Sequence, residues 1–268
     1  MKLKFFSLSS GSSGNCFYLG TPTYGILIDS GIGIRMLQKV LRERGIAIQS
    51  IMAVFITHDH ADHIRSVGNL SEQFNIPVYA TSEVHEGICC NYSVTRKISP
   101  VNKRYITKDE TLFFRDFSIT PFEIPHDGHD NVGYHIEYDG KVFCFITDIG
   151  HITPSVCKYV SSANYLVLES NYDEKMLMNG PYTYDLKMRI KGPYGHLSNH
   201  AAGDFLAQYF PPQLRHVWLC HLSRENNTPD LAYRTVEASL KAVGKKVDVD
   251  YKLTTLNRTS PSAVYEME

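Results

Sequence analysis

Four metal-binding side chains lie within six consecutive residues of the segment Thr57–Ile64, which reads T-H-D-H-A-D-H-I. Imidazole nitrogens and carboxylate oxygens are good ligands for first-row transition metals. The segment directly follows the apolar run Ile51–Ile56, which predicts a buried strand ending at this loop. The sequence therefore predicts a metal site at a strand end, with a solvated, histidine-rich loop as the alternative. The candidate ligands are His58, His60, Asp62 and His63.

The spacing inside this segment predicts two groups of ligands. Side chains two residues apart point the same way along an extended chain, so His58 and His60 can bind one ion. Asp62 and His63 are adjacent in sequence and can share a target only where the chain turns into a helix. Such a turn would direct them at a second ion about 3.5–4 Å from the first, a separation that suits hydrolysis. Asp59 points away in this arrangement, and we expect it to start the helix or to support the ligands from behind.

The composition limits the class of protein. The chain has 268 residues, which is enough for a substantial core in one large domain or two tightly joined halves. Its 27 basic and 28 acidic residues give a net charge of −1, so a nucleic-acid site must be a local patch. We expect no signal peptide, because only four apolar or small residues follow the opening Met-Lys-Leu-Lys before a Ser/Gly loop. We expect no membrane span, because the sequence has no run of 18 apolar residues. The six cysteines lack zinc-finger or secreted-scaffold spacing, which indicates the cytoplasm.

Other candidate ligands follow predicted strands farther along the chain. Asp29 ends a short apolar strand, and it either caps a turn or orients a metal-bound histidine. His126 comes just after the predicted strand Phe117–Ile124 and is favoured over His129, which we expect to be a neighbour. Asp148 follows a hairpin with an Asp-Gly turn, and it either caps a helix or bridges two ions.

Strand and helix signals occur in two similar runs along the chain. This order suggests two layered halves that meet near residue 125, each with a sheet covered by helices. We expect a helix over residues 63–74, a last buried strand over 213–219 with His221 after it, and a terminal strand near 247–253. No linker, low-complexity run or internal repeat interrupts the pattern. We therefore expect residues 1–268 to form a single domain.

The order of these positions resembles the metallo-β-lactamase superfamily, whose signature is H-x-H-x-D-H followed by a distant His, Asp and His. Within it the chain is similar to the small proteins of the YycJ/VicX type, which are described as exonuclease-like metallohydrolases. The resemblance covers essentially the whole chain. The further matching segments are Ser10–Asn15, Glu169–Tyr172, Leu186–Ile190, Gly195–Asn199 and His221–Asn226.

The resemblance implies an αββα sandwich with a two-metal site at the edge between its two sheets. Zinc is the default ion for such ligands, and manganese or iron would also fit. The implied ligands are His58, His60 and His126 for one ion, Asp62, His63 and His221 for the other, and Asp148 as the bridge. Asp29 would support the ligand histidines from behind.

A mechanism for phosphodiesters follows from this ligand set. Two cations would lower the pKa of a bridging water towards neutrality and hold the resulting hydroxide for attack on phosphorus. Asp62 would orient that hydroxide or take its proton, and His196 would approach the phosphate or protonate the leaving oxygen. The candidate phosphate contacts are Ser12, Asn15, Lys187, Arg189, Ser198 and Arg224.

The sequence therefore predicts a cytoplasmic, two-metal phosphodiesterase that acts on nucleic acid as a DNA exonuclease. The alternatives are a small-molecule ester, thioester or lactone hydrolase of the same fold and a metal-binding regulatory protein without turnover. His196 and the local cations favour a phosphate substrate, whereas the near-zero net charge favours a small molecule. No inserted nucleic-acid-binding domain is visible, so we expect such a substrate to bind an open groove. The native metal and the oligomeric state stay open.

Overall fold

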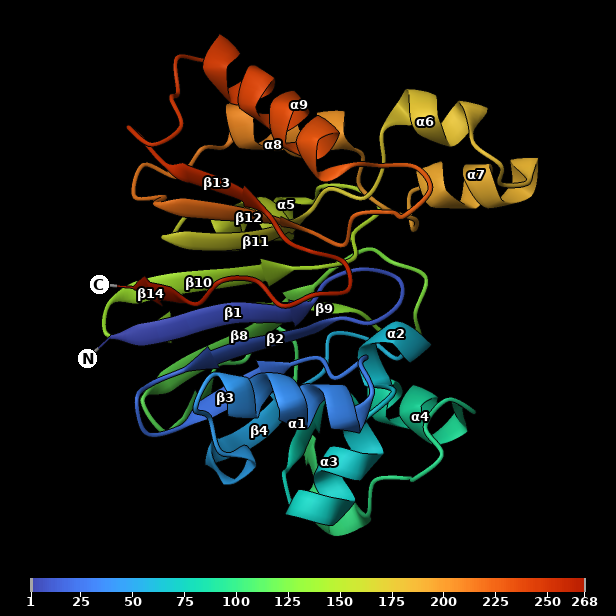
Figure 1. The fold of residues 1–268 in the computed structure, drawn as a ribbon, viewed down its shortest axis with the longest axis vertical. Coiled ribbons are helices and arrows are strands. Elements are labelled where there is room, and N and C mark those ends of the chain that lie inside the picture. The colour runs from blue at the N-terminus through green and yellow to red at the C-terminus, as the bar shows by residue number, and fades with distance from the viewer. Residues whose placement is uncertain (1, 268) are drawn as a thin grey trace. The chain divides into compact units, whose positions relative to one another are not determined.

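The computed structural model describes residues 2–267, which fall into two compact units. Unit 1 comprises the residues up to 107, residues 128–130 and the residues from 257 onward, and unit 2 comprises residues 108–127 and 131–256. Each unit contains one seven-stranded sheet with helices packed on it (Figure 1). The arrangement of the whole chain as one domain stays a prediction.

Unit 1 has a sheet of strand order β14-β1-β2-β3-β4-β5-β6, antiparallel from β14 to β3 and parallel from β3 to β6. Helix α1 packs on it because its apolar residues recur at helical spacing and form one buried stripe. The strands are β1 (Leu3–Ser9), β2 (Cys16–Gly20), β3 (Gly25–Ile28), β4 (Ile51–Phe55), β5 (Val78–Ala80), β6 (Lys103–Tyr105) and β14 (Tyr265–Met267). The helices are α1 (Ile34–Glu43), η1 (Ile48–Ser50), α2 (Ala61–Ile64), α3 (Val67–Phe74), α4 (Ser82–Cys90) and η2 (Pro100–Asn102).

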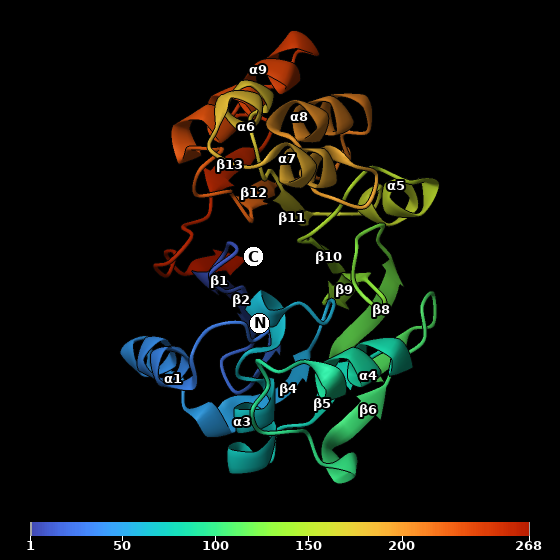
Figure 2. The same cartoon turned by 90° about the vertical axis from the view of Figure 1, so that its right-hand side faces the viewer.

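Unit 2 has a sheet of strand order β13-β12-β11-β10-β9-β8-β7, in which β10 to β13 run parallel. Helices α8 and α9 cover the side of the sheet near β11, β12 and β13 (Figure 2). The strands are β7 (Leu112–Phe114), β8 (Phe117–Glu123), β9 (Val132–Tyr138), β10 (Lys141–Ile146), β11 (Tyr165–Glu169), β12 (His216–Cys220) and β13 (Lys252–Thr255). The helices are α5 (Pro154–Val160), α6 (Glu174–Asn179), α7 (Tyr184–Lys191), α8 (Asn199–Gln208) and α9 (Pro229–Ala242).

Three predicted elements differ in the structure. The strand expected over 213–219 is β12, which begins only at His216, because the chain turns where the Leu214 amide donates to the Pro211 carbonyl oxygen at 3.0 Å. The helix expected over 63–74 is broken into α2 and α3, because the Ser66 amide donates to the Ser30 carbonyl oxygen, 2.9 Å away, instead of continuing the helix. The terminal strand expected near 247–253 begins only at Lys252, because Asp248 takes a left-handed conformation (φ 61°) and turns the chain. Strand β14, which the sequence pattern did not predict, pairs with β1.

The aromatic core of unit 2 holds a buried histidine. The His216 ring stacks on Trp218 with 3.9 Å between ring centroids, and its Nε2 lies 2.9 Å from the Thr254 hydroxyl. Burial lowers the pKa of His216, and together with a smaller effect of the nearby Lys252 ammonium it brings the value to about 3.

We expect the free energy of unfolding to fall as the pH drops from about 7.5 to 5, in part because of His216. In the unfolded chain His216 binds a proton once the pH falls below the ordinary histidine pKa, whereas in the folded protein it binds one only near pH 3. Protonation therefore favours the unfolded chain, and the free energy of unfolding at pH 5 is lower by about 2 kcal/mol. Urea unfolding of the metal-free protein at pH 7.5 and pH 5 measures this change. The free energy of unfolding should fall by about 2 kcal/mol less in His216→Gln than in the wild-type protein. His200→Gln, at an exposed position, is the control. An unchanged pH dependence in His216→Gln would contradict the prediction.

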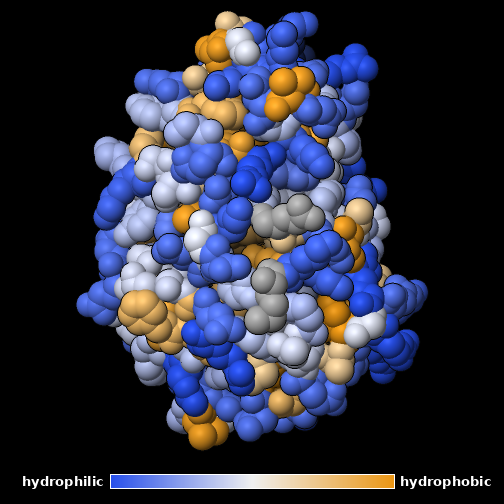
Figure 3. Space-filling view, turned by 90° about the vertical axis from the view of Figure 1, so that its left-hand side faces the viewer, coloured by the Kyte–Doolittle hydropathy of each residue, from blue (hydrophilic) through white to orange (hydrophobic). Residues whose placement is uncertain are grey.

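One face of the surface is coloured by hydropathy in Figure 3. The face seen in Figure 3 is mostly hydrophilic, with apolar side chains in small scattered groups. Within residues 2–267, no helix has the length and apolar character needed to cross a membrane.

Candidate metal centre

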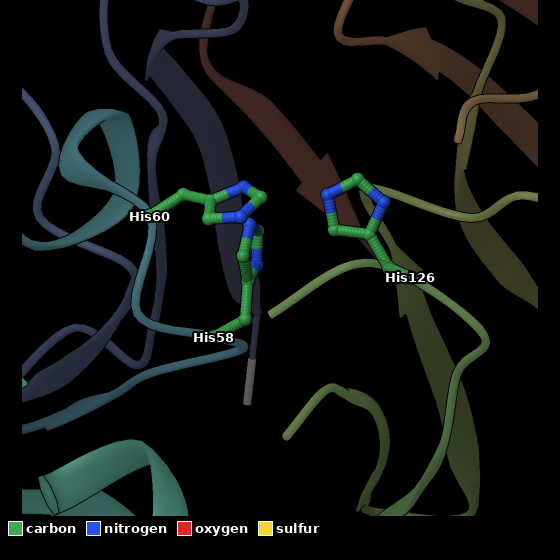
Figure 4. Close-up of side chains that lie close together, drawn as sticks. All are labelled: His58, His60 and His126. Carbon is green, nitrogen blue, oxygen red and sulfur yellow. The ribbon is translucent and has the colours of Figure 1, made fainter. Parts of the chain in front are cut away.

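Three histidines of unit 1 form a cluster directly after β4. The ring of His58 lies 4.6 Å from that of His60 and 4.1 Å from that of His63, measured between centroids. Figure 4 shows His58 and His60 projecting from the same loop with their rings adjacent, and it also draws His126 of unit 2. His58 and His63 are buried and His60 is partly exposed. The cluster gathers imidazole nitrogens, the donors that zinc prefers, so it fits a metal site.

A buried carboxylate behind the cluster fixes the orientation of His63. The Nδ1 atom of His63 lies 2.7 Å from Asp29 Oδ2, and the Thr57 amide and hydroxyl both donate to the same carboxylate. β3 and β4 are parallel neighbours, so Asp29 after β3 meets the loop after β4. Burial raises the pKa of Asp29, an effect that the contacts with His63 and Thr57 partly offset. The contact between Asp29 and His63 Nδ1 supports the predicted role of Asp29 in orienting a ligand histidine.

Asn15 and a close backbone contact hold the start of α2. The Asn15 side-chain amide lies 3.2 Å from Asp62 Oδ2 and 2.9 Å from His63 Nε2, and the Asn15 backbone amide donates to the Asp62 carbonyl oxygen at 2.7 Å. Gly31 lies against the same peptide, where an added Cβ would come within 1.5 Å of the Asp62 carbonyl oxygen. The serine and glycine loop after β1 therefore supports the metal loop through backbone contacts.

Gly31→Ala should lower the free energy of unfolding by at least about 2 kcal/mol, because the new methyl group meets backbone that cannot move aside. Gly33→Ala is the matched control, since a Cβ there has nothing within 4 Å and only the helix cap is affected, at about 1 kcal/mol or less. Denaturant unfolding of the two variants measures the difference. Equal stability of the two variants would contradict the prediction.

The carboxylate of Asp59 contacts His129, and its expected position outside the ligand set stays a prediction. Its carboxylate accepts from the His129 backbone amide at 3.1 Å and lies 2.7 Å from His129 Nδ1. Gly87 in α4 leaves room for this carboxylate, because a Cβ there would lie 2.2 Å from Asp59 Oδ2. His129, expected as a neighbour of the site, thus contacts the metal loop through Asp59.

A second cluster lies in unit 2 at the carboxyl ends of its strands. His221 follows β12 and its Nδ1 is 2.9 Å from Asp148 Oδ1, which follows β10. His126, after β8, has its Nε2 atom 3.9 Å from the same oxygen, and its Nδ1 donates to the Gly195 carbonyl oxygen at 2.8 Å. His196 Nδ1 lies 3.7 Å from Asp148. Four predicted site residues therefore come together in this unit.

Glu169, at the end of β11, organises this second cluster and was not predicted as a site residue. Its Oε1 atom lies 2.7 Å from His196 Nδ1 and 2.9 Å from His221 Nδ1, while Oε2 accepts from the backbone amides of Ile149 and Leu197. The sequence offered two signals, a carboxylate at a strand end, the same placement as Asp148, and a place in the matching segment Glu169–Tyr172.

Opposing effects set the charges of Glu169 and His196. Burial favours the neutral form of Glu169, but the neighbouring His196 and His221 outweigh it and lower the pKa of the carboxyl group. Burial likewise disfavours the imidazolium of His196, but the Glu169 and Asp148 carboxylates outweigh it and raise the pKa of His196. The pair therefore favours a protonated His196 beside an ionised Glu169.

The donor atoms of unit 2 also suit a metal ion. One ligand atom from each of Asp148, Glu169, His196 and His221 lies within 4.8 Å of all the others. Nitrogen and carboxylate oxygen donors at this spacing fit zinc or manganese. Each ion implied by the resemblance takes ligands from both units, and that pairing stays a prediction.

The six candidate phosphate contacts lie in different settings. Asn15 and Ser198 are buried, and the Ser198 hydroxyl caps α8 by accepting from the Ala201 amide. Their placement gives both residues local structural contacts and offers no support for phosphate binding. Lys187 donates to the Met178 carbonyl oxygen. The exposed residues are Ser12, Arg189 and Arg224.

The sequence matches a known protein family and relatives with names. A family model described as a Beta-lactamase superfamily domain matches residues 24–218. The chain belongs to the metallo-β-lactamase superfamily. It is 32% identical over 250 residues to the exodeoxyribonuclease WalJ of Streptococcus pneumoniae, with 93% of each chain covered. It is 28% identical over 264 residues to the exodeoxyribonuclease YycJ of Bacillus anthracis, covering 98% of this chain and 99% of that one.

The metallo-β-lactamase fold also has a close match among solved structures. The metallo-β-lactamase fold protein YhfI from Bacillus subtilis is 16% identical, with a TM-score of 0.72 and 99% of each chain covered. This likeness confirms the predicted fold class, an αββα sandwich of metallo-β-lactamase type. Membership of the superfamily confirms the prediction of a metal-dependent hydrolase.

Proposed function

We propose that the protein is a two-metal phosphodiesterase that degrades DNA from an end. The main support is the 32% identity over 93% of the chain to a protein named as an exodeoxyribonuclease. The cluster of Asp148, Glu169, His196 and His221 adds a specific chemical reason, because it provides metal ligands beside a histidine held by a carboxylate. The six cysteines, all free thiols, support a cytoplasmic location.

The two clusters would together hold two divalent ions, zinc being the first choice. When bound, the ions would supply Lewis-acid activation of water and neutralise charge on the phosphate. The proposed ligands are His58, His60 and His126 for one ion, Asp62, His63 and His221 for the other, and Asp148 shared by both. This assignment rests on the superfamily pattern and on the clustering of donors within each unit.

The other side chains would position water and move protons. Asp62, which Asn15 holds at 3.2 Å, would orient the attacking water or accept its proton. The Nδ1–H group of His196 donates a hydrogen bond to Glu169 Oε1 at 2.7 Å, which fixes the orientation of the ring. The proton on its Nε2 atom would then pass to the leaving oxygen of the phosphodiester.

Reconstitution with zinc or manganese and a panel of substrates tests this function. The panel contains 5′-phosphorylated duplex DNA, single-stranded DNA, RNA, a thioester and a lactone. We expect DNA to be shortened from an end with release of mononucleotides. Turnover of only the thioester or lactone would replace the nuclease function by a small-molecule hydrolase, and no turnover at any metal loading would favour a regulatory protein.

Metal analysis tests the ligand set independently of activity. His58→Ala and His221→Ala should each contain less bound metal than the wild-type protein. His200→Ala, which changes an exposed histidine of α8, should keep the full content. Full metal content in both ligand variants would show that the assignment is wrong.

A further inference from the structure

Helix α7 is not explained by the core of unit 2. It lies apart from α8 and α9 (Figure 1). Helix α7 has no buried residue, although a helix of a globular protein ordinarily buries one face. It carries three basic side chains, Lys187, Arg189 and Lys191, against one acidic side chain, Asp185, so its net charge is +2. The apolar residues of α7 are only partly buried, so core packing does not account for its basic residues.

The chain from α7 to His196 is tied to the site at several points. Arg189 forms an ion pair with Asp127, the residue after His126, at 2.6 Å. The carbonyl oxygen of Gly195 accepts from His126 Nδ1 at 2.8 Å. Gly195 must be glycine here, since a Cβ would lie 2.2 Å from the Ile190 carbonyl oxygen. These contacts place α7 beside the histidines of unit 2.

Three side chains of this segment have no task inside the protein. Tyr184 is 70% exposed and Tyr194 is 60% exposed, and Lys191 is also exposed. Within residues 2–267 none of the three makes a hydrogen bond, an ion pair or a ring contact. Tyr184 and Lys191 are seven residues apart on α7, so they lie on the same face of the helix.

We propose that this surface, made of Tyr184, Lys191 and Tyr194, binds single-stranded DNA next to the site. The inference rests on the proposed function and adds to it a means of holding the strand. Exposed aromatic rings stack on bases whatever their sequence, and a cation beside them pairs with phosphate. A protein partner would instead favour a desolvated apolar patch with few charges, whereas α7 is positively charged. Helix α7 would then form one side of the open groove expected from the sequence.

Anisotropy measurements with a fluorescent oligothymidylate and metal-free, full-length protein test this surface without turnover. Stacking of one base on a ring corresponds to about 5-fold to 160-fold in affinity, so Tyr184→Ala and Tyr194→Ala should each raise the Kd within this range. Tyr184→Phe and Tyr194→Phe keep the ring and should bind like the wild-type protein. Lys191→Ala should reduce the slope of log K against log salt by about one.

Tyr209→Ala and Lys241→Ala change an exposed tyrosine and an exposed lysine on other helix ends, and they should bind DNA like the wild-type protein. Thermal unfolding of every variant checks that the fold is kept. If the Tyr184 and Tyr194 variants bind as tightly as the wild type while the wild type degrades DNA, this inference is wrong and the proposed function stands. If the wild-type protein neither binds nor degrades DNA, both are wrong.

Discussion

Asp62→Asn should lower kcat for DNA degradation by about 10²-fold to 10⁴-fold, the range for losing a positioned acid or base. The carboxylate of Asp62 is partly exposed, at 19% of the side chain, whereas the adjacent His63 is fully buried. The Asn15 side-chain amide donates to this carboxylate, and the Asn15 backbone amide donates to the carbonyl oxygen of the same residue. A residue fixed in this way and still open to solvent is suited to hold water for attack. Steady-state release of nucleotides from DNA measures the effect.

The metal content of this variant separates two roles of Asp62. A lower content together with low activity would mark Asp62 chiefly as a ligand, and full content with low activity would mark it as the group that orients water or takes its proton. Asp204→Asn, an exposed aspartate of α8, should leave both quantities unchanged. Wild-type activity and metal content in Asp62→Asn would remove the residue from the site.

Candidate ligands could be predicted from the sequence because they sit where strands end. His58 follows β4 and His126 follows β8, and a strand carries its C-terminal loop to one edge of the sheet whatever the details of packing. Spacing within the metal loop was also informative, because His58 and His60 are only two residues apart in the chain and therefore lie close together in the structure. Elements set by local sequence were thus predicted well.

Features that depend on contacts between distant segments could not be predicted. The break between α2 and α3 depends on a hydrogen bond from Ser66 to Ser30, and β14 depends on pairing with β1 at the other end of the chain. Helix propensity depends on the local sequence and cannot show that the Ser30 carbonyl oxygen will bind the Ser66 amide. Glu169 lies in a segment that matched the superfamily, yet its role depends on four groups brought to it by three other loops.

Glu169→Gln should lower activity and metal affinity by about 10-fold to 100-fold, the usual effect of losing a group that orients metal ligands. The carboxylate accepts hydrogen bonds on both oxygens, from two imidazoles on one side and two backbone amides on the other. An amide has one oxygen, so one of these pairs would face an N–H group in a fully buried position. Nucleotide release and metal titration measure the loss, and Glu137→Gln, at an exposed position of β9, is the matched control.

A double-mutant cycle separates positioning by Glu169 from a general loss of stability. If Glu169 acts by holding His196, the effect of Glu169→Gln on kcat should be much smaller in a His196→Ala background, because the histidine that it orients is gone. A loss caused only by weakened packing would be the same in both backgrounds, since packing does not depend on the acid in the reaction. The residual effect in the His196→Ala background would then report the second contact of Glu169, with His221, and should appear as reduced metal affinity.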